Sequence, residues 1–347
     1  MPDKILFFRP DHIGDLLLTT PAICLMKKSF PENELVLMIN PSAKDILKNN
    51  PYVDRIELCD FVFIKGFNRK VIFNTLSNLV KVRKGKFDAV FNFRVSAVAG
   101  AFVYFSGGRE IFGFDIKKSK WAHSRVIHYN SERHVVDNYL SLVEAYGCKG
   151  ENNEGLQIFL TEEEKSGFKR KVNLDRKYII LCPGAGELSK LWLNDRWSEI
   201  ADWILNNTDY EIVFTGVSRE KDMVEEIMKM MKIGTDKVHN FAGFLSLREF
   251  AILVNGAEFI VAVDSGSVHI SVAMKTPVVG LYGPHNPIEW GPYNNGLPNK
   301  VIVKKNYDCQ FCKKYDCKKK YCMKDIYVED VIEKIEELLN DLKKLNG

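Results

Sequence analysis

Long hydrophobic runs are missing from this sequence. Arg94 interrupts the most apolar stretch, from Ala89 to Phe105, so no run reaches the ~18 apolar residues that a membrane-spanning helix requires. The start of the chain also lacks a signal peptide, because Arg9 and Asp11 follow a short apolar stretch and no small-residue cleavage site comes next. We therefore expect a cytoplasmic protein. Cysteines in that compartment more often remain free thiols or bind metals than form disulfides, and we expect the same of the eight cysteines here.

Internal repeats of the solenoid kind are also absent. Of the 347 residues, 46% are hydrophobic and 27% are charged, a composition that excludes wholesale disorder. At roughly 150 residues per domain, a chain of this length is expected to form two domains.

Acidic residues are missing from one long stretch of the first half. Residues 1–150 hold 22 Lys and Arg against 15 Asp and Glu, whereas the net charge of the whole chain is only +4. The excess predicts an anionic partner (a phosphorylated substrate, an acidic membrane surface or nucleic acid), with a solvated helix face as the alternative. Nucleic acid is the weakest of these, because Phe67 and Phe73 interleave the strip without a recognised motif. The basic strip between Asp60 and Asp88 consists of Lys65, Arg69, Lys70, Lys81, Arg83, Lys84 and Lys86.

Short apolar runs alternate with amphipathic stretches along the rest of the chain, which is typical of βαβ units around parallel sheets. A charged stretch interrupts the alternation and is the expected linker, so we predict an α/β protein of two similar halves with a cleft between them. The expected parts are a domain over 1–160, a linker over 161–177, a second domain over 178–325 and a C-terminal helix over 326–347. Predicted strands are Lys4–Arg9, Glu34–Asn40, Arg55–Cys59, Asp88–Phe93, Glu110–Phe114, Tyr178–Cys182, Glu211–Thr215, Glu258–Val263, Pro277–Tyr282 and Lys300–Val303. Predicted helices are Leu16–Phe30, Ile72–Lys84, Val135–Tyr146, Arg196–Asn206, Glu220–Lys232, Leu247–Asn255, Val268–Met274 and Val328–Leu345.

Open parallel sheets bind ligands beyond the carboxyl ends of their strands, so the loops after the strands hold the candidate residues. The first such loop runs from Arg9 through Gly14 to Asp15, where a helix is expected to begin. Asp15 is either the cap of that helix, accepting backbone N–H groups, or a carboxylate at the floor of the cleft that takes a proton. Asp11 is the competing candidate for the base.

The second loop follows the predicted strand that ends at Cys182. Its small residues Gly184 and Ala185 leave backbone N–H groups accessible, and Lys190 adds a mobile cation, an arrangement that suits a phosphate. It is not a Walker A loop, because the Lys-Ser/Thr pair and its glycine spacing are absent. The alternative is a surface loop with an incidental lysine.

The third loop carries Asp264 and Ser265 directly into a predicted helix. Gly266 and Ser267 offer N–H groups at the positive end of that helix, which suits a diphosphate. His269, one turn further on, either reaches the same anion or packs under the strand that follows.

These three loops resemble those of glycosyltransferase family 9, the ADP-heptose:lipopolysaccharide heptosyltransferases. The resemblance rests on Ile-Gly-Asp within 9–21, on Gly-Ala and Lys-x-Trp within 183–197, and on the block 240–290, in the family's order over nearly the whole chain. The last block contains Asp-Ser-Gly-x-x-His followed by Gly-Pro. The resemblance implies a GT-B architecture: two Rossmann-like domains, with the acceptor bound by the first and the nucleotide sugar by the second.

The resemblance also implies roles for individual residues. The family's proposed base falls on Asp15 and its diphosphate-binding lysine on Lys190. The family often places an acidic residue after the strand that here ends at Thr215; Glu220 is the expected substitute, and the sugar and nucleotide stay open. The expected donor-binding residues are Gly184, Ala185, Glu220, Asp264, Ser265, Gly266, Ser267 and His269.

Four cysteines fall within fourteen residues near the end of the second domain. Four thiolates at such spacings form a tetrahedral zinc site in many proteins, and the lysines around them favour the thiolate form. Only one Cys-x2-Cys pair is present, so a disulfide and unligated thiols remain the alternatives to a structural metal. The cluster consists of Cys309, Cys312, Cys317 and Cys322.

Together these features predict an inverting glycosyltransferase that moves a sugar, which the resemblance makes heptose, from an ADP-linked or other nucleoside-diphosphate donor to a lipopolysaccharide core or related glycan. We expect no metal or other cofactor, because Lys190 and a helix N-terminus carry the diphosphate charge and neither donor loop contains Asp-x-Asp. Lys65, Arg69 and Lys70 are expected to bind an anionic, lipid-linked acceptor at the inner face of the cytoplasmic membrane, with no nucleic-acid partner. The alternative is a non-catalytic protein of the same fold that binds a nucleotide sugar or a glycan. An epimerase on this architecture is not expected, because it needs further acidic residues that the second half does not show.

Overall fold

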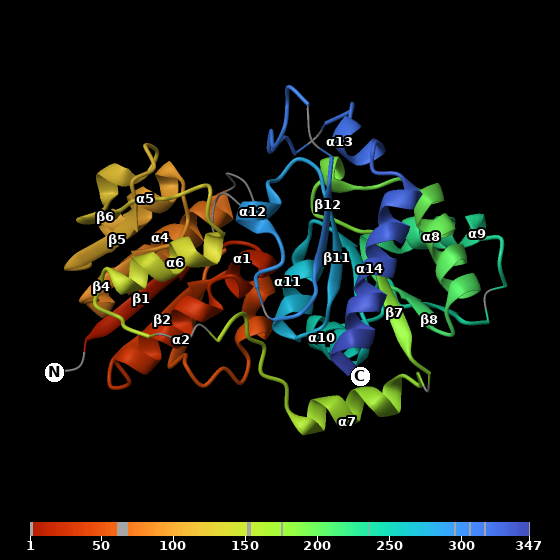
Figure 1. The fold of residues 1–347 in the computed structure, drawn as a ribbon. Helices are drawn as coiled ribbons and strands as arrows, with labels where there is room; N and C mark the ends of the chain where they lie inside the picture. Colours follow the sequence, from red (N-terminus) through yellow and green to blue (C-terminus); the bar gives the residue numbers. More distant parts are fainter. Residues whose placement is uncertain are drawn as a thin grey trace. The chain divides into compact units, whose positions relative to one another are not determined.

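The computed structural model describes residues 3–60, 69–150, 154–174, 176–234, 236–294, 296–304, 307–315 and 317–346. The chain divides into two compact units, Met1–Phe159 and Leu160–Gly347 (Figure 1). Each unit is built on one sheet of six parallel strands. None of the described helices is long and apolar enough to span a membrane.

The sheet of the first unit has the strand order β3-β2-β1-β4-β5-β6. Its central strand β1 is apolar from Ile5 to Phe8 and fully buried there, as is typical of a parallel sheet that is covered on both faces. Phe7 of β1 lies opposite Leu37 on one neighbouring strand and Phe91 on the other. The strands are β1 (Lys4–Arg9), β2 (Glu34–Ile39), β3 (Arg55–Leu58), β4 (Ala89–Asn92), β5 (Glu110–Phe114) and β6 (Arg125–Ile127).

The single helix predicted over Leu16–Phe30 is in fact two. The first ends at Leu17, and the second restarts with Pro21 in its first turn, where a residue without an N–H is tolerated. The structure also contains α5, whose run of apolar residues has no helical period, and β6, which is only three residues long. The helices of this unit are α1 (Ile13–Leu17), α2 (Thr20–Ser29), α4 (Arg69–Gly85), α5 (Ala97–Phe105) and α6 (Val135–Glu144), with 3-10 turns η1 (Pro41–Leu47) and η2 (Lys120–Ala122).

The second unit repeats this plan with the strand order β12-β11-β10-β7-β8-β9. The apolar strands β7 and β10 lie side by side at its centre and are buried along their whole length. Strand β9, which was not predicted from the sequence, is only three residues long. The strands are β7 (Tyr178–Cys182), β8 (Glu211–Phe214), β9 (Val238–Asn240), β10 (Ile260–Val263), β11 (Val278–Tyr282) and β12 (Lys300–Val303).

The segment predicted as a linker contains a helix, α7, that belongs to the second unit. A capping box starts it: the Thr161 side chain accepts from the Glu164 N–H, and the Glu164 carboxylate accepts from the Thr161 N–H. Glu164 also forms an ion pair with Arg248 of α10, at 2.6 Å, and Phe168 is buried. The helices are α7 (Glu162–Lys171), α8 (Asn194–Asn207), α9 (Lys221–Met230), α10 (Leu247–Gly256), α11 (Gly266–Ala273), α12 (Pro287–Trp290), α13 (Tyr321–Lys324) and α14 (Val328–Asn346), with 3-10 turns η3 (Leu188–Lys190) and η4 (Ser218–Glu220).

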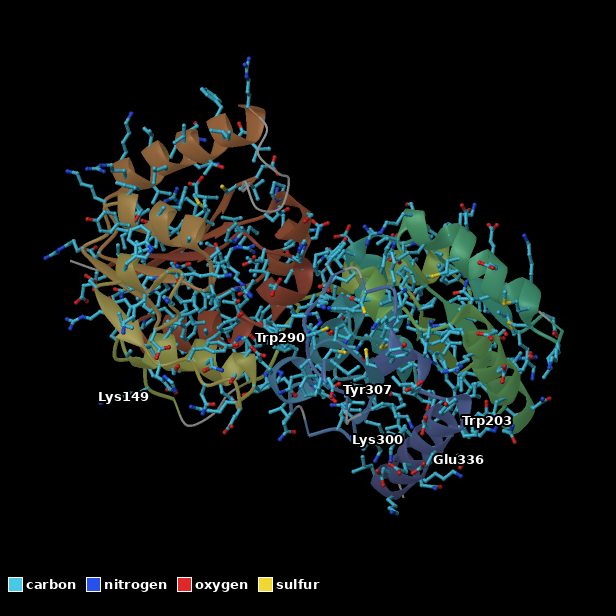
Figure 2. The ribbon with its side chains drawn as sticks, turned by 90° about the horizontal axis from the view of Figure 1, so that it is seen from above. Lys149, Trp203, Trp290, Lys300, Tyr307 and Glu336 are labelled. Carbon is cyan, nitrogen blue, oxygen red and sulfur yellow. The ribbon has the colours of Figure 1, made fainter. Side chains whose placement is uncertain are left out.

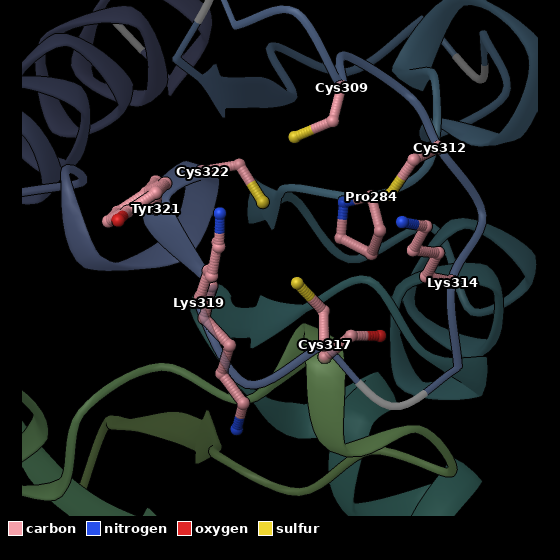
Figure 3. Close-up of a pocket in the computed structure, with 10 residues that line it drawn as sticks. Pro284, Cys309, Cys312, Lys314, Cys317, Lys319, Tyr321 and Cys322 are labelled. Carbon is pink, nitrogen blue, oxygen red and sulfur yellow. The ribbon is translucent and has the colours of Figure 1, made fainter.

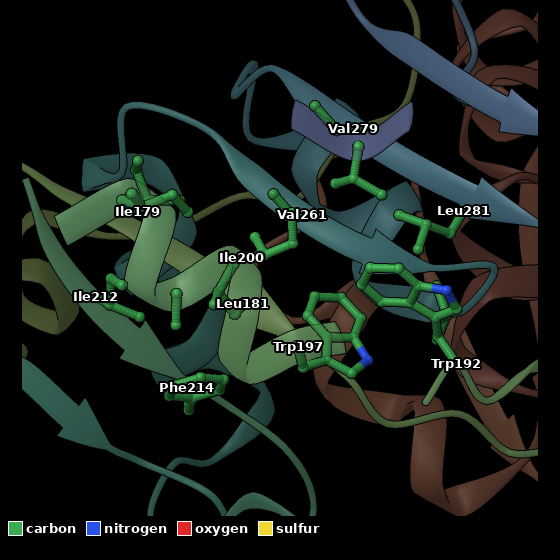
Figure 4. Close-up of a cluster of buried hydrophobic side chains, with 14 of the residues drawn as sticks. Ile179, Leu181, Trp192, Trp197, Ile200, Ile212, Phe214, Val261, Val279 and Leu281 are labelled. Atoms are coloured by element: carbon green, nitrogen blue, oxygen red, sulfur yellow. The ribbon is translucent and has the colours of Figure 1, made fainter. Parts of the chain in front are cut away.

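The core of the second unit gathers around two tryptophans (Figure 4). Trp197 of α8 is fully buried, and Trp192 meets it edge-on with the ring centroids 5.3 Å apart. The Trp192 indole N–H donates to the Ile326 carbonyl at 2.9 Å and so ties the segment before α14 to this core. Lys300 at the start of β12 (Figure 2) pairs with Asp341 of α14 at 2.7 Å. The C-terminal helix is therefore an integral part of this unit.

Both sheets have the strand order of the Rossmann fold, in which the order reverses between the first and the fourth strand. The reversal lies between β1 and β4 in the first unit and between β7 and β10 in the second. Loops leave these neighbouring strands in opposite directions and open a crevice at their carboxyl ends. The residues just after these four strands are therefore the candidates for a functional site.

Candidate active site

Arg9 is the centre of the polar cluster at the reversal point of the first unit. It ends β1 and is almost completely buried, yet its guanidinium donates to the Phe93 carbonyl and to the Tyr139 hydroxyl, both at 2.6 Å. It also pairs with Asp15 at 2.9 Å and with Asp11 at 3.2 Å. The planar fork of an arginine is well suited to hold several acceptors in fixed positions.

The sequence predicted a helix from Leu16 with Asp15 as its cap or as a base, but the helix begins earlier and Asp15 lies within its first turn. The helix α1 begins at Ile13 after His12, and one Asp15 oxygen accepts the His12 N–H at 3.3 Å, which closes the first turn. The other oxygen faces Arg9. Because the Asp15 side chain is still 26% exposed, its carboxylate combines a capping role with access to solvent.

Asp11 differs from Asp15 in being almost completely buried. It lies between two guanidinium groups, since Arg94 forms an ion pair with its second oxygen. Burial, together with the neighbouring charge of Arg9, lowers the pKa of Arg94 to about 10. Arg94 follows β4, the strand beside β1, so the reversal point brings it to the cluster. Neither arginine was predicted as a site residue from the sequence, although Arg9 is the last residue of β1 and Arg94 follows β4 by two residues.

Lys190, Asp264 and His285 form the corresponding cluster at the reversal point of the second unit. The same Asp264 oxygen lies 3.0 Å from the Lys190 ammonium and 3.0 Å from the His285 ring nitrogen Nδ1. Lys190 follows β7 and Asp264 follows β10, while His285 comes from the loop after β11. Lys190 and Asp264 were expected at the site. His285 was not, although it stands just after a predicted strand.

The Asp264 carboxyl is held in its ionised form. Its burial alone acts to raise the pKa, but the hydrogen bond from His285 and the charge of Lys190 more than offset this, so the pKa of Asp264 lies below its usual range. A carboxylate cannot itself bind a diphosphate. Asp264 therefore orients the two cationic or hydrogen-bonding side chains beside it, which are the groups suited to an anion.

The start of α11 lies next to this cluster. Ser265 precedes the helix in an extended conformation, and its buried hydroxyl has no hydrogen-bond partner among the described residues. Gly266 is the first helical residue, with Ser267 next. His269 is buried within the first turns of α11.

Glu220 reaches the loop after β7 from the neighbouring loop. Its carboxylate accepts the Val217 N–H at 2.8 Å and fills the space beside Gly184, where an added Cβ would come within 2.2 Å of it. Burial raises the pKa of Glu220. Arg219, the residue before it, approaches the Ala185 carbonyl at 3.5 Å. Gly184, Ala185 and Glu220 are thus neighbours, and their role in donor binding stays a prediction.

A sequence profile of glycosyltransferase family 9 (heptosyltransferase) matches residues 77–322, well over half of the chain. The chain belongs to glycosyltransferase family 9. It is therefore a glycosyltransferase enzyme, and the alternative of a non-catalytic binding protein is set aside.

Individual relatives of this family 9 member cover almost its whole length. It is 25% identical over 353 residues to the lipopolysaccharide core heptosyltransferase OpsX of Haemophilus influenzae, with 97% of each chain covered. It is 27% identical over 338 residues to lipopolysaccharide heptosyltransferase 3 of Escherichia coli K12, with 94% of this chain and 95% of the relative covered.

Solved structures support the fold class. The ADP-heptose lipopolysaccharide heptosyltransferase II of Escherichia coli matches with a TM-score of 0.77 at 21% identity, covering 98% of this chain and 99% of the other. A family 9 glycosyltransferase of Veillonella parvula matches with a TM-score of 0.78 at 24% identity, covering 97% of both chains. The predicted α/β fold of GT-B type is confirmed.

Only one of the three residues expected to bind the acceptor is fully described in this family 9 protein. Arg69 begins α4 and is exposed. Lys70 lies on the same helix, but its side chain is outside the described residues, as is the whole of Lys65. Their role in acceptor binding stays a prediction.

The four clustered cysteines surround one cavity of about 190 Å³ in the second unit (Figure 3). Among the described residues no disulfide joins them, and no three His, Cys, Asp or Glu side chains are arranged to hold a metal ion. The structural metal therefore stays a prediction. The segment also contacts the loops that follow β7 and β11: the Tyr315 hydroxyl donates to the Gly186 carbonyl at 2.9 Å, and the Lys313 N–H donates to the Pro284 carbonyl at 3.1 Å.

Thiol titration should separate the eight cysteines into two groups. Cys24, Cys59, Cys148 and Cys182 are buried, and burial raises their pKa to about 11 or 12, so they should react only after unfolding. The four cysteines of the cluster should react with dithiobis-nitrobenzoate in the folded protein. More than four reactive thiols before unfolding would contradict the structure. Repeating the titration with added Zn²⁺ tests the metal: protection of the cluster confirms it, and unchanged reactivity contradicts it.

Asp264 should link stability to acid pH. Its pKa is lower in the folded than in the unfolded chain, so its contribution is complete above the unfolded value of about 4 and is lost as the pH falls through the folded value. Asp264→Asn should therefore lower Tm at neutral pH, and the difference from the wild type should shrink as the pH falls below about 4. A Tm difference that is independent of pH would show that Asp264 stabilises the fold by packing alone.

Proposed function

We propose that the protein is an inverting, metal-independent heptosyltransferase that transfers heptose from an ADP-linked donor to a lipopolysaccharide core or related glycan. The names of the relatives supply the sugar and the acceptor class. The observation that carries the proposal is the arrangement at the two reversal points. One holds an accessible carboxylate, Asp15, and the other holds a lysine paired with a buried aspartate, Lys190 with Asp264.

The second unit would bind the donor. Breaking the bond between the sugar C1 and the diphosphate builds negative charge on the leaving group, and fixed cations and N–H dipoles stabilise that charge. Lys190 would turn its ammonium from Asp264 toward the phosphates, with the Ser265 hydroxyl and the N-terminus of α11 as further donors. Glu220 lies beside Gly184 and would form a hydrogen bond with a ribose hydroxyl. Because its pKa is raised, it would accept that bond as a carboxylate or donate it as a carboxylic acid.

The first unit would bind the acceptor and supply the base. In an inverting transfer, the acceptor hydroxyl attacks C1 from the face opposite the diphosphate, and its proton passes to a carboxylate. Asp15 suits this role better than Asp11, because it is partly exposed whereas Asp11 is enclosed by Arg9 and Arg94. Arg9 is then the positioning residue that fixes the Asp15 carboxylate.

We further propose that the acceptor is an anionic, lipid-linked glycan and that the enzyme works at the inner face of the cytoplasmic membrane. The cation-rich first half of the chain supports an anionic acceptor. Lys65, Arg69 and Lys70 are the residues proposed to contact it. Nucleic acid is not proposed as a partner.

Replacing Lys190 tests the donor site. Lys190→Ala should weaken ADP binding by about 10- to 100-fold, because a charge-assisted hydrogen bond to phosphate is lost. Isothermal titration calorimetry in the presence of a chelator measures both this change and the binding of ADP without a divalent metal. Lys177→Ala is the matched control, since Lys177 is an exposed lysine of the same unit that pairs with Glu258. Wild-type affinity in Lys190→Ala, or no ADP binding without Mg²⁺, would refute the donor assignment.

Replacing Asp15 tests the base. Asn keeps the hydrogen bond to the His12 N–H but cannot take a proton. It also loses the ion pair with Arg9, which keeps its other acceptors, so Asp15→Asn should cost no more than ~1 kcal/mol of stability. Its kcat should fall by roughly 10²–10⁴, with ADP affinity unchanged. Radiolabelled sugar transfer, thermal unfolding and calorimetry measure the three quantities.

Asp11→Asn is the matched control, and it should behave in the opposite way. It removes a buried carboxylate from two guanidinium groups, so it should destabilise the protein by roughly 3 kcal/mol. If Asp15→Asn transfers sugar at close to the wild-type rate, Asp15 is only a cap and the base lies elsewhere.

A further inference from the structure

Helix α4 carries apolar side chains on two opposite faces. Val71 and Val82 are buried against the first unit. On the other side, Phe73 is 72% exposed, Leu76 is 56% exposed, and Val80 continues the stripe one turn further on. A surface helix of a water-soluble protein ordinarily presents a polar outer face, so an apolar outer face calls for a partner.

Helix α5 is a neighbour of α4 in the first unit (Figure 1). A second group of exposed rings lies at its end. The rings of Tyr104 and Phe105 meet edge-on, with their centroids 5.3 Å apart. The ring of Trp121, which is 56% exposed, has its centroid 5.7 Å from that of Tyr104. Arg83 near the end of α4 donates to the Phe105 carbonyl at 3.4 Å and so connects the two groups. The α4–α5 surface, as we name it, consists of the exposed residues Ile72, Phe73, Leu76, Val80, Tyr104, Phe105 and Trp121.

Exposed cations accompany the α4–α5 surface along the chain. None of them has an acidic partner within the described residues, in contrast to Arg109 and Arg125, which pair with Asp88 and Glu110. The unpaired cations are Lys81, Arg83, Lys84, Lys86, Lys117, Lys118 and Lys120. Their charge is therefore available to an anionic partner.

We propose that the α4–α5 surface docks the enzyme onto a lipid bilayer that contains anionic headgroups. Apolar and aromatic side chains set among unpaired lysines are the features of helices that lie in the membrane interface, with the rings at headgroup depth and the cations on the phosphates. The inference deepens the proposed function, because a lipid-linked acceptor is presented at such a bilayer.

The same observations argue against other occupants. In a symmetric dimer through this face, identical patches would meet, and the unpaired cations of one copy would face those of the other. A nucleic acid would satisfy the cations but would leave the aliphatic stripe of Leu76 and Val80 in contact with a charged backbone. An anionic bilayer accommodates both the apolar side chains and the charge.

Vesicle co-sedimentation of the full chain tests the proposal without depending on catalysis. The protein should bind vesicles of phosphatidylcholine mixed with phosphatidylglycerol, and bind pure phosphatidylcholine much less. The double variant Phe73→Ser/Leu76→Ser should bind the mixed vesicles at least ~10-fold more weakly, because it removes two apolar side chains from the interface. The triple variant Lys81→Gln/Lys84→Gln/Lys118→Gln should lose roughly fivefold per cation and most of the salt dependence.

A matched control and a second readout keep the outcomes distinct. Leu345→Ser removes a similarly exposed leucine (62%) from α14 of the second unit and should leave vesicle binding unchanged. Transfer to a lipid-free acceptor glycan should be the same in all these variants. Equal vesicle binding by the wild type and Phe73→Ser/Leu76→Ser, or a change from dimer to monomer in that variant, would overturn the docking surface. Absence of transfer by the wild type would instead overturn the proposed function.

Discussion

The reversal of strand order in each sheet is the constraint from which the rest of the site follows. At that point two neighbouring strands send their loops to opposite sides, and the carboxyl ends between them are left uncovered by helices. Polar groups placed there need partners, because the strands beneath them are buried and apolar. This explains why the charged side chains of each unit gather after its two central strands, β1 and β4 or β7 and β10.

Each unit has one buried charged side chain at the centre of its polar cluster, and the two charges have opposite signs. In the first, a buried cation, Arg9, is surrounded by carboxylates and carbonyl or hydroxyl oxygens. In the second, a buried anion, Asp264, is surrounded by Lys190 and His285. The outer members of each cluster are the ones that solvent reaches, so the first unit presents a carboxylate and the second presents cationic or hydrogen-bonding groups.

Local patterns in the sequence were sufficient to predict many of the strands and several residues of the two polar clusters. Strand β1 matches its prediction at both ends because a run of apolar residues stops at a charged one, and the rule of looking after strands was enough to select Asp15, Lys190 and Asp264. What failed depends on contacts between distant segments. The charged helix α7 has little apolar pattern of its own, and its contacts with α10 include the ion pair between Glu164 and Arg248. Similarly, His285 and Arg94 become site residues only when the sheet brings their strands beside β10 and β1.

The geometry of Arg9 limits what can replace it. Its guanidinium lies almost wholly inside the protein and serves Asp15, Tyr139 and the Phe93 carbonyl through nitrogens that point in different directions within one plane. A lysine would conserve the charge, but its donors radiate from a single atom at the end of a thinner chain. At least one of these oxygen acceptors would then be buried without a hydrogen-bond donor. The tolerance of position 9 is thus set by the shape of the cation and not by its charge.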